Sequence, residues 1–434
     1  MPKVTGYNFT NMRKSSRYAC FTKFSSYVDS PLDFKYVVQL QFLMNTVGSW
    51  PYKQFGRNRV AAILSTYNAF LILVGTTVCG LGLIYMRVNI VKLSFFDLGH
   101  NILCWLLEIL YLQRLITART NKYQETIKDY LLDFNLFYFK GRSPYAAKVH
   151  AQIHIISGMF TIYVMWQMVI GVSLFMFMPW FNNYSRGMFG ENRPQNSTFE
   201  HSVYYYLSPG IYTTEEEYWL LFIFNFSLSY VTTIGMCVFD LLLILIVFQI
   251  WGHLRILKHN LENIPLPENS IMYSVEENNN IRILLKENIL HHNLIVKFVD
   301  RCSDAFSEYL FAFYMLMQLI TCILLLEVTS FSADSLAKYG PLTVVIHQQL
   351  IQVSIMFEML NTKSEQLIDA VYAIPWEHMD TKNRRTVLFF LHRIQTPVSL
   401  KAAKVVPVGV NTMFAVLKTT FSYYMMLKTL AGER

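Results

Sequence analysis

The chain has 434 residues, of which 53% are hydrophobic and only 15% are charged, and its formal net charge is +8. Soluble domains usually carry about 25% charged residues, so this composition excludes an ordinary soluble protein and indicates a multi-spanning membrane protein. The basic residues are spread over segments between apolar stretches, which argues against nucleic-acid binding. The first 35 residues are polar and basic, so we expect no cleavable signal peptide.

In chain order, the first predicted element is a short amphipathic helix at 37–50, on the inner membrane face and ended by Pro51. Seven apolar stretches that follow reach the roughly 20 residues that a bilayer-spanning helix requires. The sequence therefore predicts an all-α polytopic membrane protein with seven transmembrane helices, at 60–86, 95–116, 150–178, 218–248, 306–326, 342–360 and 404–430.

The distribution of Lys and Arg between the spans predicts the orientation. Alternate segments hold 28 of these residues and the intervening segments hold six; the rich segments are 1–60, 117–150, 251–301 and 362–404. By the positive-inside rule, the amino terminus lies in the cytoplasm and the carboxyl terminus outside the cell. This is the reverse of a G-protein-coupled receptor, and the Asp-Arg-Tyr and Asn-Pro-x-x-Tyr motifs of those receptors are missing.

Helical periodicity continues beyond the predicted membrane spans at 250–261, 278–302 and 360–372. Asp380 or Thr381 can cap a further helix at 384–394. These helices either pack together below the membrane or lie separately on its surface. The predicted topology divides the chain into four parts. The first is a cytoplasmic amino-terminal segment at 1–59, and the second is transmembrane helices 1 to 6 at 60–360, with a long outer loop at 179–217 and cytoplasmic extensions at 250–305. The third is a cytoplasmic anchor segment at 361–403, and the fourth is the last helix at 404–430.

The last apolar stretch contains polar residues, among them Asn411, Lys418 and Ser422. Polar side chains at membrane depth are costly unless they face protein or water. This helix therefore either lines a water-filled path or packs inside a bundle through small polar residues.

The sequence contains no recognisable catalytic or metal-binding motif. The six cysteines lack metal-site spacing, and no nucleophile triad or glycine-rich phosphate loop is evident, so we expect no enzyme activity, cofactor or metal. The sequons at Asn183 and Asn196 fall in the predicted outer loop and are weak candidates for glycosylation.

The third predicted span offers aromatic and apolar residues with one or two polar groups, which is the composition of a site for a hydrophobic small molecule. The same spacing is also ordinary for core packing. The residues concerned are Met159, Phe160, Tyr163, Trp166, Gln167 and Ile170.

The carboxyl-terminal third carries a combination of motifs that is more specific. Pro375-Trp376 precedes a basic helix with Arg384-Arg385, then come Pro397-Val398 and a last helix that ends in Ser422-Tyr423-Tyr424-x-x-Leu427. This combination resembles insect odorant receptors, and the run PWExMDTxNRRTV resembles moth receptors of the pheromone-receptor type. The motifs cover about the last 60 residues.

The resemblance implies a channel subunit of seven helices. Four such subunits would surround a central pore, which is lined by the last helix of each subunit. It implies an odorant-gated, non-selective cation channel in the plasma membrane of olfactory sensory neurons. The ligand would be a volatile hydrophobic odorant or pheromone, and the partner a common co-receptor subunit in a heterotetramer. The long cytoplasmic insertion of that co-receptor is missing, so the chain resembles the ligand-selective subunit.

The resemblance also implies functional positions. The ligand site of the family lies in the outer half of helices two, three, four and six, which favours Tyr163 and Trp166 together with Phe226 and Tyr230 on the fourth helix. For the gate it implies an apolar ring at Met426, with Thr429 and Leu430 beside it on the same face of the last helix. An apolar ring closes a pore by dewetting it.

A hypothesis of another class stays open beside the channel. The chain would then be a non-channel membrane receptor or a transporter that signals through other proteins. The inverted repeats and broken midplane helices of many transporters are not evident in the sequence.

Overall fold

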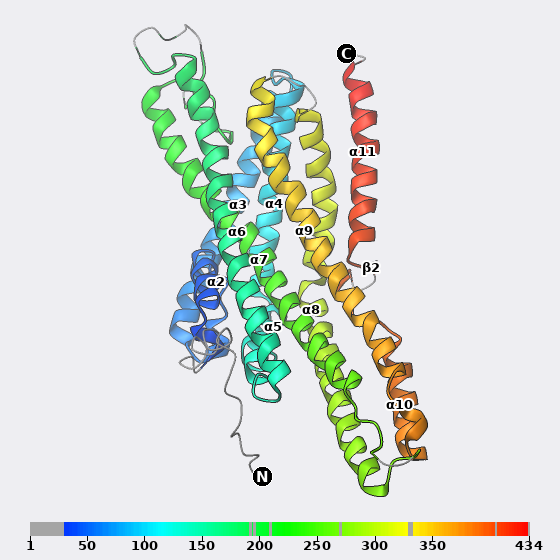
Figure 1. Ribbon diagram of the computed structural model, residues 1–434. Helices are drawn as coiled ribbons and strands as arrows, with labels where there is room; N and C mark the ends of the chain where they lie inside the picture. Colours follow the sequence, from blue (N-terminus) through cyan, green and yellow to red (C-terminus); the bar gives the residue numbers. More distant parts are fainter. Residues whose placement is uncertain are drawn as a thin grey trace, which may run out of the picture.

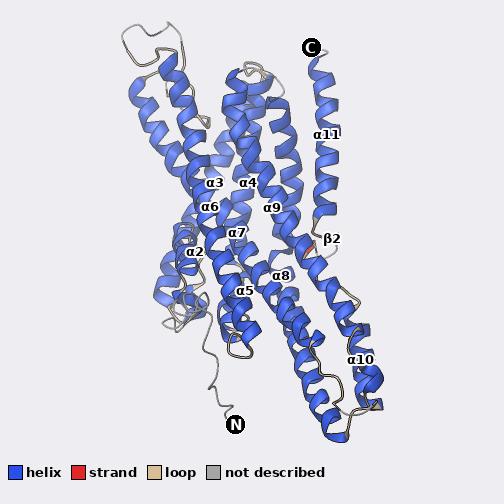
Figure 2. Ribbon diagram, in the orientation of Figure 1, coloured by secondary structure: helices blue, strands red, loops and turns tan. Residues whose placement is uncertain are grey.

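A computed structural model describes residues 30–190, 193, 197–207, 211–268, 271–328, 333–403 and 406–432. Within these residues the chain is a bundle of long helices (Figure 1), and helix dominates its secondary structure (Figure 2). Six of the described helices are long and apolar enough to cross a membrane: α3 (Asn58–Asn89), α4 (Phe95–Arg119), α6 (Pro144–Ser185), α7 (Glu215–Glu262), α8 (Val275–Val328) and α9 (Ala333–Tyr372).

The seventh predicted span corresponds to α11 (Val410–Gly432), which lies alongside α8 and α9 in Figure 1 and packs against both. A hydroxyl pair joins it to α8, because Thr321 and Thr420 are buried with their Oγ1 atoms 3.1 Å apart. The helix begins later than predicted. Strands β1 (Lys401–Ala402) and β2 (Val406–Pro407) form a small antiparallel pair before it.

The predicted continuations of the fourth, fifth and sixth spans are confirmed, since α7, α8 and α9 each run on as single helices. Helix α10 (Thr381–Ile394) is capped by Asp380, whose Oδ1 accepts a hydrogen bond of 2.8 Å from the Asn383 amide. Asn383 in turn donates to the Asn278 carbonyl of α8 at 2.9 Å. The extensions therefore pack together, and the arrangement as separate surface helices is wrong.

Two predicted boundaries are wrong. Helix α6 continues through Pro179 to Ser185, so the outer loop begins later than residue 179. Helix α2 (Lys35–Thr46) ends before Gly48 and not at Pro51. Gly48 has a φ of +65°, and a Cβ atom there would lie 2.8 Å from the Leu64 carbonyl oxygen, so the turn requires glycine.

Helix α2 also has a different role from the predicted one. Its apolar side chains Val37, Leu40 and Met44 are fully buried, because the helix packs against α6 and α7. Helix α2 is therefore part of the bundle core and not an amphipathic helix that lies on the membrane surface. Helix α5 (Asn121–Leu132) is a further element that the sequence did not predict, and it packs against α8.

The two ends of the bundle have different contents. Figure 1 shows α2 and α10 toward one end and the carboxyl end of α11 at the other. We call the first the anchor end. The opposite end holds the amino-terminal halves of α4, α7 and α9 and the carboxyl-terminal half of α6, and it contains the candidate site.

Candidate ligand-binding site

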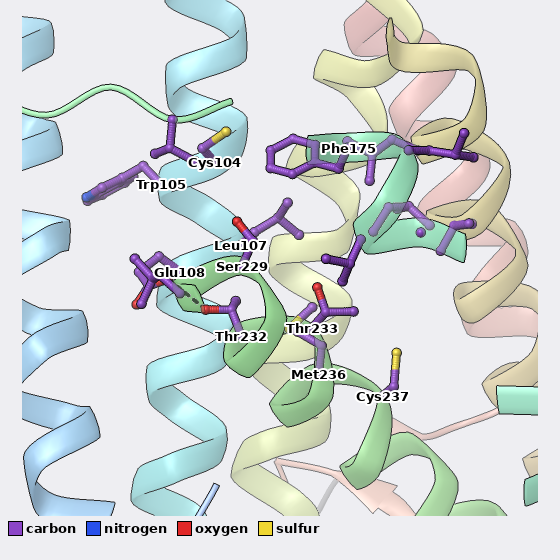
Figure 3. Close-up of a pocket in the computed structure, with 18 of the residues that line it drawn as sticks. Cys104, Trp105, Leu107, Glu108, Phe175, Ser229, Thr232, Thr233, Met236 and Cys237 are labelled. Carbon is purple, nitrogen blue, oxygen red and sulfur yellow. Dashed lines mark hydrogen bonds between the residues drawn. The ribbon is translucent and has the colours of Figure 1, made fainter. Parts of the chain in front are cut away.

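A cavity of about 180 Å³ lies between α3, α4, α6, α7 and α9, covered by residues 203–205 of the segment between α6 and α7. Its wall is mostly apolar: Figure 3 shows Phe175 of α6 and Leu107 of α4 beside it, with Thr232, Thr233, Met236 and Cys237 following one another along α7. A concave, mostly apolar space with a few polar groups is the usual form of a small-molecule site.

A carboxyl group provides the strongest polar feature of the cavity. The Thr232 hydroxyl donates to Glu108 Oε2 at 3.4 Å (Figure 3). The other oxygen, Oε1, is buried and has no hydrogen-bond partner among the described residues. Gly75 of α3 makes room for it, because a Cβ atom at that position would lie 2.7 Å from Oε1. A buried carboxyl oxygen without a partner is costly, so it is a ready hydrogen-bonding point for a ligand.

Glutamine side chains provide two further polar points. Gln349 of α9 donates to Cys237 Sγ at 3.5 Å, while its own oxygen has no partner within the part of the chain that the structure describes. The Gln167 amide nitrogen of α6 is likewise buried without a partner there. Together with Glu108, these groups can fix the orientation of a bound molecule.

The segment between α6 and α7 covers the cavity at the end of the bundle opposite to the anchor end. The ring Nε2 of His100 on α4 lies 2.8 Å from the Ser202 carbonyl, and Asn225 of α7 donates to the Val203 carbonyl at 3.2 Å. The Tyr212 hydroxyl donates to the Tyr205 carbonyl at 2.6 Å. These hydrogen bonds hold the segment over the cavity as a cover.

His201 in this cover is 2% exposed. Burial disfavours the charged imidazolium and lowers the pKa of His201 to about 4. The cover is therefore neutral at this position near physiological pH.

A buried ion pair lies below the floor of the cavity. Arg114 of α4 pairs with Asp240 of α7 at 3.1 Å, and it also contacts the sulfur of Met236, which lines the cavity. Tyr309 of α8 donates to Asp240 at 2.6 Å and accepts from Arg114 at 3.0 Å. The Arg114–Asp240–Tyr309 cluster thus joins three helices directly beneath the cavity.

Comparison with known proteins identifies the family. Residues 145–421 match the family model described as 7tm odorant receptor. The chain belongs to the odorant receptor family. This membership makes it a receptor and not an enzyme.

Curated relatives of this odorant receptor are distant in sequence. Odorant receptor 22b of Drosophila melanogaster is 23% identical over 145 residues, which are 33% of this chain and 36% of that protein. Odorant receptor 67c of the same species is 22% identical over 212 residues, which are 49% of this chain and 51% of that protein. The matched region thus spans between about a third and about half of these relatives.

Solved structures share the fold over nearly the whole chain. The insect olfactory receptor OR5 from Machilis hrabei in complex with eugenol has a TM-score of 0.71 and 12% sequence identity, covering 95% of this chain and 99% of that one. A second structure of OR5, described without a ligand, gives the same TM-score at 13% identity. At this identity the likeness establishes the fold of an insect olfactory receptor.

The six ligand-binding residues predicted from sequence lie elsewhere than the cavity. The exposed fraction is 67% for Met159, 64% for Trp166 and 44% for Tyr163 on α6, and 38% for Phe226 and 43% for Tyr230 on α7. Phe160 is partly buried against Phe248. Two further residues of the group predicted on this span, Gln167 and Ile170 of α6, do line the cavity, together with Phe175 of the same helix. These six residues remain an untested second set.

Sequence reasoning did not assign Phe175, Thr233 or Cys237 to a site. Their apolar or small side chains resemble those of any membrane helix. Glu108 could have been found, because an ionisable residue inside a membrane span is a functional candidate by its cost alone.

The predicted gate residues lie on an exposed part of α11. Met426 is 53% exposed and Thr429 is exposed, with the Thr429 hydroxyl donating to the Met425 carbonyl at 3.0 Å. The side chain of Leu430 lies outside the described residues. The exposed Lys428 has its Nζ 5.8 Å from the centre of the ring of the buried Tyr424.

The two sequons have different outcomes. Asn183 is fully buried in α6, and its amide nitrogen donates to the Glu200 carbonyl at 2.8 Å. Since a glycan would attach to this nitrogen, the geometry argues against glycosylation there. Asn196 lies outside the described residues.

Proposed function

We propose that this chain is the ligand-selective subunit of an odorant-gated, non-selective cation channel. Its partner is a co-receptor subunit in a heterotetramer, and its location is the plasma membrane of olfactory sensory neurons. The observation that carries the proposal is the mostly apolar cavity in a chain of the odorant receptor family. A similarly folded olfactory receptor binds eugenol, a small molecule of the class that such a cavity accepts.

The ligand that we propose is a volatile hydrophobic molecule with at least one polar group. Apolar side chains such as Phe175 and Leu107 provide the area for burial, and Glu108 and Gln349 provide hydrogen-bonding points. A sex pheromone is the narrower candidate, supported by the likeness of the run from Pro375 to Val387 to moth receptors of that type.

The orientation that we propose puts the cavity in the outer half of the membrane. The 28 Lys and Arg residues of the predicted inner segments support a cytoplasmic amino terminus and an extracellular carboxyl terminus. The hydrogen-bonded cover over the cavity then faces the outside, where odorants arrive. An epitope tag after Arg434 should stain intact cells, and staining restricted to permeabilised cells would contradict this orientation.

Expression with and without the co-receptor tests the channel function. We expect a panel of volatile odorants to evoke a fast cation current only when both subunits are present, and we expect the current to persist under a G-protein block. A response that disappears under the block would instead support the non-channel receptor. Phe175→Ala in the same assay tests whether the odorant-evoked current depends on the cavity, because the Phe175 side chain is part of the cavity wall.

A further inference from the structure

A second cleft lies at the anchor end of the bundle, outside the odorant cavity. It has a volume of about 270 Å³ and lies between the start of α6, the end of α7 and the end of α9. Its wall carries three cationic side chains, Arg255, Lys258 and Lys363, against a single carboxylate, Glu262. The cleft therefore has an excess of positive charge.

The positive charges are only partly neutralised by the protein itself. Lys258 lies 3.7 Å from Glu262, one turn further along α7, and both side chains are partly exposed. Neither Arg255 nor Lys363 has a carboxylate within 4.0 Å among the residues described. Lys363 instead donates to the Gln366 side-chain oxygen at 3.3 Å. Two cations that are half-buried and lack a protein counter-ion favour an anion from outside.

Aromatic side chains hold these groups in place. The Arg255 guanidinium lies 5.3 Å from the centre of the Trp251 ring, and the His259 ring stacks on Tyr145 with 3.7 Å between ring centres. The indole Nε1 of Trp251 is buried and has no hydrogen-bond partner in the described chain. The cleft thus presents an N–H donor beside its cations, with the Arg255 side chain oriented by stacking.

We propose that this cleft binds a phosphate-bearing anion, and that the phosphorylated head group of a membrane phosphoinositide is its source. Several cations, an indole donor and a concave shape match the charge and the oxygen acceptors of a phosphomonoester. Basic pockets between membrane helices on the cytoplasmic side are a known form of lipid head-group site. In the proposed orientation this cleft is on that side, near the inner leaflet. Helices α6, α7 and α9 also line the odorant cavity, so a ligand here holds together three helices of the receptor site.

The test is binding of the purified full-length receptor to vesicles. Phosphatidylcholine vesicles containing phosphatidylinositol bisphosphate are compared with vesicles containing an equal charge of phosphatidylserine and with plain phosphatidylcholine. We expect binding to be tightest to the phosphoinositide vesicles. Arg255→Gln and Lys363→Gln should each weaken it about fivefold, the effect of removing one charge near a lipid surface.

Lys122→Gln provides the matched control, since Lys122 is exposed on α5 at the same end of the bundle and does not line the cleft. It should leave the affinity unchanged, and Lys363→Arg should retain it. The melting temperature of each purified variant shows that the receptor is folded. Equal weakening by Lys122→Gln would mean that general surface charge is responsible, and would overturn the proposal.

Soluble inositol trisphosphate distinguishes the two sources of the phosphate group. If soluble inositol trisphosphate competes with the vesicles only when it is in large excess over the lipid, the ligand is the head group of a membrane lipid. Tight binding of the soluble molecule, lost in Lys363→Gln, supports the site with a soluble phosphate as its ligand. Absence of binding to both probes overturns the site. None of these measurements uses an odorant, so their failure is distinguishable from failure of the proposed channel function.

Discussion

The two ends of α7 differ in how they are packed. From Ile234 to Ile250 the helix is buried on nearly every face, whereas between Trp219 and Tyr230 large apolar side chains are exposed. At the anchor end, His253 is within 2.7 Å of the Phe134 carbonyl and 2.9 Å of His291. Polar atoms without partners occur in both regions: the two ring nitrogens of His292 and the indole Nε1 of Trp251 at the anchor end, and oxygens of Glu108 and Gln349 at the cavity end, lack partners among the described residues.

This difference separates two tasks. Close packing gives a fixed arrangement of helices, which the anchor end needs to stay together. A cavity with unpaired polar atoms is a local cost that a bound molecule can offset. The unpaired polar atoms therefore lower the stability of the cavity end but allow it to bind a ligand. The Arg114–Asp240–Tyr309 cluster lies at the boundary between the two regions.

The largest effect is expected at that boundary. Arg114→Met leaves Asp240 buried without its counter-charge, which typically costs roughly 3–5 kcal/mol. The melting temperature and the surface expression of the receptor should both fall. The double variant Arg114→Met with Asp240→Leu removes both charges and should recover most of the loss. A single variant as stable as the wild type would show that the cluster does not fasten the two regions together.

The anchor end should respond to a core truncation with a loss of stability alone. Phe134 is 1% exposed and its ring stacks on Phe298 with 3.9 Å between centres. Phe134→Ala should cost about 3 kcal/mol through the cavity that it leaves, measured by thermal unfolding of the purified receptor.

The matched control for this truncation is Phe389→Ala on α10, where the ring is 72% exposed. It should change the melting temperature little. The rank order of odorants should stay the same in both variants. A changed rank order in Phe134→Ala would mean that the anchor end also shapes the ligand site.

The cavity end should show the opposite response. Phe175→Ala removes apolar contact with the ligand, and the concentration for half-maximal current should shift roughly tenfold or more, by different amounts for different odorants. Trp166→Ala, on an exposed face of the same helix, should shift it less. A larger shift in Trp166→Ala would favour the residues predicted from sequence over the cavity.

The smallest effect is expected on α11. Met426→Ser replaces an exposed apolar side chain by a small polar one, and wetting of an apolar constriction should raise the current without odorant about twofold or more. In the heterotetramer that we propose, the co-receptor subunits would limit the effect. Recordings at matched surface expression measure it, and an unchanged basal current with unchanged ion selectivity would exclude Met426 from the gate.

Local signals in the sequence determined much of the fold. Span length and hydropathy predicted the membrane helices, and the periodicity at 278–302 and the cap at Asp380 predicted the helices of the anchor end correctly. Each of these signals acts within one or two helical turns, where neighbouring residues decide the outcome. The motifs between Pro375 and Leu427 indicated the family for a similar reason, because each is a short stretch of neighbouring residues.

Only the tertiary structure decided which faces meet. On a soluble helix, the polar face marks the outside, but lipid is as apolar as a protein core, so a membrane helix is apolar on both sides. Trp166 and Gln167 are neighbours in sequence, yet the first is exposed and the second lines the cavity. The pairing of Arg114 with Asp240 likewise depends on two helices distant in the chain, and Asn183 is buried where the loop at Glu200 returns to α6. Their positions follow from packing, which no local pattern in the sequence specifies.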